Sequence, residues 1–139
     1  MVYKLKQWLP AVFPSYCRLC GSTTRTALEL CGPCRDEAPW LGNACQQCSL
    51  PLPALQGDGL CGRCQRLAPA FDATTALFHY RPPVDYLIKR LKFSSELAIS
   101  PLLATLLANR LAGRSTPLPS LLLPVPLHHT RLRERGYNQ

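Results

Sequence analysis

The chain has 139 residues, a length that predicts one or two small domains. It contains no run of about 18 consecutive apolar residues, so the sequence does not indicate a transmembrane helix. The formal net charge is +8 before any charge on the eight cysteines is counted, and the fourteen prolines indicate short elements separated by turns.

The first segment, residues 1–14, is predicted to be a short amphipathic helix. Val2, Leu5 and Leu9 recur at helical spacing, and prolines at positions 10 and 14 end the pattern. Because helices this short are marginal alone, we expect it to pack against the rest of the protein. Adsorption to a membrane surface is the alternative, which two lysines in two turns support only weakly.

All eight cysteines lie between residues 17 and 64, in four pairs of the form C-x-x-C. They group as C-x2-C-x10-C-x2-C followed by C-x2-C-x12-C-x2-C, close to the spacing of two successive four-cysteine zinc sites. Two residues between cysteines let the backbone curl so that both sulfurs face one point. The predicted ligands are Cys17, Cys20, Cys31, Cys34, Cys45, Cys48, Cys61 and Cys64.

Residues 15–66 are therefore predicted to form a double zinc ribbon with two structural Zn²⁺ ions, because four thiolates leave no open position for catalysis. Sequential pairing is favoured, since each group closes a short loop, but crossed pairing as in RING-type modules stays open. Disulfides are disfavoured because no secretory signal is visible and cysteines separated by two residues rarely bridge. A thioredoxin-like redox site at Cys31-Gly32-Pro33-Cys34 is disfavoured because no apolar strand precedes it.

Metal binding would affect both stability and charge. Apolar side chains in 15–66 are few, so zinc, at roughly 10 kcal/mol of folding free energy per site, must be the main source of stability there. Eight thiolates and two Zn²⁺ would reduce the formal charge of +8 to roughly +4, which weakens the argument for a polyanionic partner. Reduced, zinc-bound cysteines predict a cytoplasmic protein.

Two helices are predicted after the cysteines. An apolar stripe at i, i+3, i+4 and i+7 from Val84 predicts the first, and Pro82-Pro83 precedes it. Its basic residues lie off the stripe, where they would be solvated or, alternatively, would contact DNA backbone. Ser100-Pro101 signals the start of the second helix, as an N-cap followed by a first-position proline, and Gly113 ends it.

Two strands are also predicted. Residues 74–80 are rich in strand formers. The apolar run 121–127 predicts a strand buried on both faces of a parallel sheet, short and near an edge because it contains prolines. Two helices and two strands cannot cover one another as a closed α/β layer, so the sequence is expected to be cut within a domain.

The whole pattern resembles the ComF (GntX-like) family of competence-associated proteins. The resemblance is carried by the four C-x-x-C pairs, by VDYLIKRLKF at 84–93, and by VPL at 125–127 followed by RLRERGYNQ at 131–139. Members of this family combine an N-terminal double zinc ribbon with a type I phosphoribosyltransferase domain. The resemblance implies a small zinc-ribbon module with little regular structure, followed over 67–139 by an incomplete α/β phosphoribosyltransferase-like domain.

The resemblance also implies functional residues. Arg131, Arg133 and Arg135 would face a diphosphate or a nucleic-acid phosphate, although by composition alone they are typical of a solvated basic loop. The family's phosphoribosyl-diphosphate loop contains an Asp-Asp pair, and the only neighbouring acids here are Asp36-Glu37, within the cysteine segment. Phosphoribosyl diphosphate and Mg²⁺ are therefore expected only in a full-length form. The chain alone is expected to be inactive, and no catalytic residue is assigned.

A second hypothesis is a zinc-ribbon adaptor that binds single-stranded DNA or a DNA-processing protein. The basic charge supports it only modestly, because the sequence shows no obvious aromatic platform for stacking bases. DNA-uptake proteins and the missing C-terminal half of the domain are further expected partners. His128 and His129 are expected to be surface histidines in a turn, with a general-base role as the alternative.

Overall fold

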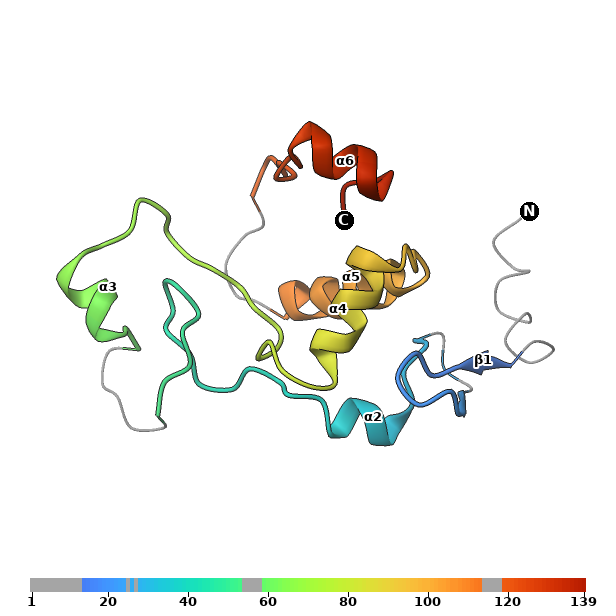
Figure 1. Ribbon diagram of the computed structural model, residues 1–139. Coiled ribbons are helices and arrows are strands. Elements are labelled where there is room, and N and C mark those ends of the chain that lie inside the picture. The colour runs from blue at the N-terminus through green and yellow to red at the C-terminus, as the bar shows by residue number, and fades with distance from the viewer. Residues whose placement is uncertain (1–13, 25, 27, 54–58, 114–118) are drawn as a thin grey trace.

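The computed structural model describes residues 14–24, 26, 28–53, 59–113 and 119–139 (Figure 1). The predicted helix over 1–14 lies outside this part of the chain, apart from its last residue. Among the described residues, no helix is long and apolar enough to cross a membrane. In chain order the elements are β1 (Ser15–Tyr16), β2 (Thr23–Thr24), α2 (Gly32–Asp36), α3 (Gly62–Arg66), α4 (Val84–Phe93), α5 (Ile99–Ala112) and α6 (His129–Arg135).

Residues 15–37, called the first ribbon below, consist of a hairpin followed by α2. β1 and β2 pair antiparallel, with Ser15 opposite Thr24. The turn between them is tight, because the Cys17 carbonyl accepts a hydrogen bond from the Gly21 N–H at 2.9 Å. Gly21 has a φ of +74°, a conformation that favours a residue without a Cβ.

Residues 42–76, called the second ribbon below, leave and rejoin the rest of the protein through two adjacent segments. Segments 39–41 and 77–79 run antiparallel and exchange two backbone hydrogen bonds of 2.8 Å. The rings of Trp40 and Phe78 pack between them with centroids 4.5 Å apart. Figure 1 shows the result, with α3 at one end of the molecule and the first ribbon at the other.

Both predicted helices are present. α4 buries Val84, Leu87 and Leu91 of the predicted stripe. α5 begins one residue before Ser100 and its N-cap is Ala98, so the predicted N-cap is wrong by two positions, but the helix ends before Gly113 as predicted. α5 contacts α4 and crosses it in the middle of the molecule (Figure 1).

One hydrophobic cluster joins the first ribbon to this helical pair. Cys17 and Leu30 of the ribbon share it with residues of α4 and α5, and the partly buried Leu77 and Phe78 pack against it. The buried members are Cys17, Leu30, Leu87, Leu91, Ile99, Leu102 and Leu106. The core therefore crosses the boundary at residue 66 that the sequence predicts between two domains, and that boundary stays a prediction.

The predicted strands over 74–80 and 121–127 are wrong. Within 74–80 only Phe78 makes an isolated bridge, and 121–127 is extended chain without a partner strand among the described residues. The predicted burial is also wrong, because Leu122 and Val125 are 83% and 84% exposed. Residues 77–79 do pair with 39–41, but only through this one bridge, which is too short to count as a strand. Residues 121–127 have no neighbouring edge to bond among the described residues, and strand-forming side chains do not make a strand without one. The incomplete α/β domain is therefore not confirmed.

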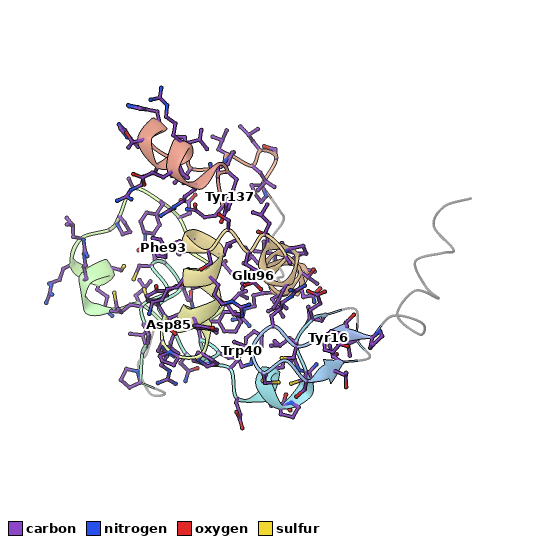
Figure 2. The ribbon with its side chains drawn as sticks, turned by 45° about the vertical axis from the view of Figure 1, so that its right-hand side comes forward. Tyr16, Trp40, Asp85, Phe93, Glu96 and Tyr137 are labelled. Atoms are coloured by element: carbon purple, nitrogen blue, oxygen red, sulfur yellow. The ribbon has the colours of Figure 1, made fainter. Side chains whose placement is uncertain are left out.

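Residues 129–135 form a helix, α6, where the sequence predicted a turn or loop. The His128 side chain accepts a hydrogen bond from the Thr130 N–H at 3.4 Å, and Gly136 ends the helix at a φ of +77°. The Tyr137 hydroxyl then donates to the Leu91 carbonyl, which ties the last residues to α4 (Figures 1 and 2).

Candidate metal centres

The eight cysteines converge in the sequential pairing that the spacing favours. Within each group the four sulfur atoms all lie within 4.8 Å of one another. Crossed pairing is therefore wrong for this chain. The first site contains Cys17, Cys20, Cys31 and Cys34, and the second contains Cys45, Cys48, Cys61 and Cys64.

The two sites are built in the same way. The first pair of each lies in a tight turn: the Cys45 carbonyl accepts from the Ser49 N–H at 2.8 Å, as the Cys17 carbonyl accepts from Gly21. The second pair of each begins a helix, because Cys31 is the N-cap of α2 and Cys61 is the N-cap of α3. In each site the turn and the first residues of the helix each direct two sulfurs toward the same point. This shared geometry explains why the C-x-x-C spacing recurs.

The distances between sulfurs fit zinc and exclude disulfides. Cys20 Sγ and Cys31 Sγ are 3.6 Å apart, and Cys48 Sγ and Cys61 Sγ are 3.7 Å apart. Zn–S bonds of about 2.3 Å in a tetrahedron place sulfurs about 3.8 Å apart, whereas bonded sulfurs lie about 2.05 Å apart. All eight cysteines are free thiols. The two clusters therefore fit two structural zinc ions, each with a closed shell of four thiolates.

Hydrogen bonds and burial move the pKa values of the thiols apart. Hydrogen bonding with Ser22 lowers the pKa of Cys20 to about 6, and the backbone N–H of Cys48 lowers the pKa of Cys45 to about 6. Burial raises the pKa of Cys64 to about 12 and also raises the pKa of Cys34. Each site thus combines a thiol of lowered pKa with a thiol of raised pKa, and binding of a cation by four thiolates would release protons.

The two sites differ in what surrounds them. The first lies against the main core, with Cys17 buried in it and Cys31 and Cys34 packed on it. The second has a separate small cluster in which Leu52 and Leu60 pack on the buried cysteines. The second site is therefore not supported by the main core, and zinc must contribute a larger share of its stability than at the first site.

Ion pairs, which the sequence did not predict, reinforce the attachment of the first ribbon. Arg18 Nη2 lies 2.5 Å from Glu29 within the ribbon, and Arg90 Nη2 of α4 lies 2.5 Å from Glu96. The two pairs are linked, because Arg90 Nη1 donates to the Arg18 carbonyl at 2.9 Å and Arg18 Nη1 lies 3.7 Å from Glu96. The charged residues are visible in the sequence, but Arg18 and Arg90 are 72 positions apart, and nothing in the sequence indicates that they are in contact.

The three arginines predicted to face an anion lie on α6, and the helix does not bring all three together. Residues two apart on a helix point in different directions, so Arg133 diverges from Arg131 and Arg135. Arg131 forms an ion pair with Glu134 at 2.8 Å. Arg135 lies over the ring of Phe93, with Cζ 5.5 Å from the ring centroid, and Nη1 donates to Gln139 at 2.8 Å. Their anion-binding role stays a prediction.

Comparison with known proteins agrees with this architecture. Residues 8–65 match the family model of the double zinc ribbon domain. The DNA utilization protein YhgH of Salmonella typhi is 34% identical over 133 residues, which cover 91% of this chain and 57% of that protein. Competence protein F of Haemophilus influenzae is 42% identical over 83 residues, covering 57% of this chain and 36% of that protein.

The double zinc ribbon match, together with the likeness to YhgH and competence protein F, supports the ComF-like family that the sequence predicted. The YhgH protein of Escherichia coli K12 is 33% identical over 127 residues, which cover 88% of the ComF-like chain and 49% of that protein. The ComF-like chain thus spans about half the length of the curated relatives it matches. No solved structure matches it significantly.

Proposed function

We propose that this ComF-like chain is a zinc-stabilised module that binds single-stranded DNA in the cytoplasm. The observation that carries the proposal is the likeness, over 91% of the chain, to a protein named for DNA utilization, joined by a likeness to a competence protein. Both four-cysteine sites fit closed metal shells, and closed shells support folding and not catalysis. A binding role is what such a scaffold supports best.

Binding would be tested with the zinc-loaded chain and a fluorescein-labelled oligothymidylate of about 16 nucleotides. Anisotropy should rise with protein concentration, and the affinity should fall as salt increases because phosphate contacts release counterions. Absence of binding at low salt would refute the proposal. Retention of a DNA-processing protein without any affinity for the oligonucleotide would instead favour an adaptor that acts through protein contacts.

A second proposal concerns residues 67–139, and the exposed apolar run supports it. Residues 121–125 form an extended, exposed segment of apolar, strand-forming residues that has no partner strand among the described residues. The arginines of α6 follow it. We propose that this region is the first part of a phosphoribosyltransferase-like α/β domain. In a protein as long as the relatives, a strand from the additional sequence would pair with residues 121–125. Phosphoribosyl diphosphate and Mg²⁺ would bind only in such a longer form.

The same proposal holds that the 139 residues alone do not transfer a phosphoribosyl group, since they contain no Asp-Asp pair. Diphosphate release from phosphoribosyl diphosphate by this chain would contradict it. Saturable, Mg²⁺-dependent binding of phosphoribosyl diphosphate by a version extended to the relatives' length, and not by this chain, would support it. Mutation of Arg135 to Ala in that longer version should weaken anion binding.

A further inference from the structure

α4 carries a stripe of aromatic and cationic side chains opposite its buried face. Tyr86, Lys89, Arg90 and Phe93 stand at i, i+3, i+4 and i+7, so they share one side of the helix. Tyr86 and Phe93 are 54% and 72% exposed. The hydrophobic core does not use these rings, and large exposed aromatic side chains grouped with cations indicate an interaction surface.

A guanidinium group lies over each ring. Arg90 Cζ is 5.2 Å from the centroid of Tyr86, and Arg135 Cζ is 5.5 Å from that of Phe93. Arg135 belongs to α6, and Figure 2 shows Phe93 at the end of α4 that faces α6 and Tyr137. The tie from the Tyr137 hydroxyl to the Leu91 carbonyl holds α6 at this end of α4. The stripe therefore begins on one helix and is completed by another.

Acidic partners neutralise most of the charge on the stripe. Lys89 pairs with Asp85 at 2.7 Å, and Arg90 pairs with Glu96 at 2.5 Å. Arg135 has no acidic partner among the residues that the structure describes, and it bonds only to the neutral Gln139 there. The surface thus offers two ring faces and a small positive charge, which suits a ligand recognised by stacking more than by charge alone.

We propose that this stripe binds the bases of single-stranded DNA, with Tyr86 and Phe93 as stacking platforms and Arg135 beside the phosphates. The inference rests on the proposed DNA-binding function and assigns its site to α4 and α6 instead of to the ribbons. Seven residues separate the rings by about 10 Å along the helix, roughly three times the 3.4 Å step between stacked bases. The rings therefore contact bases separated along the strand, and duplex DNA, whose bases are already stacked, binds less well.

The test measures anisotropy of the labelled oligothymidylate with the zinc-loaded full chain and its variants. Phe93→Ala and Tyr86→Ala should each weaken binding by about 5- to 150-fold, the range expected for one stacked base. Phe93→Trp should restore binding, whereas Phe93→Leu should not, because only an aromatic ring has a face for stacking. Tyr16→Ala is the matched control, since Tyr16 is 56% exposed on the opposite side of the molecule (Figure 2) and should leave affinity unchanged.

Charge is tested separately. Arg135→Gln should weaken binding and reduce the slope of log affinity against log salt by about 0.7, the value of one phosphate contact to a single strand. Arg110→Gln removes the same charge from the exposed end of α5 and should change neither quantity. If the unaltered chain binds the oligonucleotide and both aromatic variants bind it equally well, the stripe is not the site although the proposed function stands. If the unaltered chain does not bind, both proposals fail.

Discussion

A substitution inside α5 should release zinc from the first ribbon, because the helix and the ribbon share one core. Ile99 is fully buried and belongs to the same cluster as Cys17 and Leu30. Ile99→Val removes one buried carbon and should cost about 0.5–1.5 kcal/mol. Ile99→Ala should cost about 2–5 kcal/mol, which approaches the total stability of many small domains, so the valine variant is the informative one.

The assay is a urea titration followed by two signals. Far-UV circular dichroism reports the helices, and a chromogenic chelator reports zinc release. With a denaturant slope of about 1–3 kcal/mol per molar urea, Ile99→Val should lower the unfolding midpoint of the helices by about 0.5 M. The release of one zinc equivalent should move with it, and the release of the other should not.

Leu52→Ala provides the matched control, because Leu52 packs only in the separate cluster of the second site. This variant should shift the other zinc equivalent and leave the helical signal unchanged. If both zinc equivalents and the helices shift together in both variants, the two ribbons unfold as one unit, and the second site is not independent of the helical core.

Three further outcomes are expected. Gly21→Ala should destabilise the first site by about 1–2 kcal/mol in a thermal melt, because a φ of +74° strains any residue with a Cβ. Gly62→Ala, at a helical position with open space around the Cβ, should be neutral or slightly stabilising in the same assay. Glu96→Gln should cost about 1 kcal/mol by weakening the ion pairs of Arg90 and Arg18, and the loss should shrink at high salt, which melting at two ionic strengths would reveal. Cys31→Ser should lower both the zinc content and the affinity for single-stranded DNA, whereas Cys61→Ser should lower only the zinc content, as metal analysis and anisotropy on the same samples would show.

The parts of the molecule that local chemistry specifies could be predicted from the sequence. The C-x-x-C spacing predicted both four-sulfur clusters and their sequential pairing, because the turn and the helix start that present the sulfurs are each encoded within a few residues. The apolar stripe from Val84 predicted α4, and Gly113 predicted the end of α5. These signals depend on backbone geometry over one or two turns, which distant residues do not change.

The predictions that failed depended on partners the sequence could not specify. Residues 121–127 have the composition of a buried strand, but a strand needs a neighbouring edge, and none lies beside them among the described residues. The exposed aromatic stripe on α4 was missed for a different reason. Tyr86 and Phe93 lie off the predicted apolar stripe, so the sequence already implied their exposure. Only the folded structure shows that Arg90 and the distant Arg135 lie over their rings.

Arg90 explains how a structural metal can matter to a surface that contains no metal ligand. Its Nη1 bonds to the Arg18 carbonyl, one residue after the ligand Cys17, while its guanidinium also lies over the ring of Tyr86. The position of Arg18 depends on the turn that the first site closes, and Glu96 holds Arg90 from the other side at 2.5 Å. Loss of the first site would free one of the two anchors of Arg90 and loosen the core on which α4 packs. The second site has no such connection to α4 among the described contacts, so its zinc would stabilise its own ribbon and leave the stripe in place.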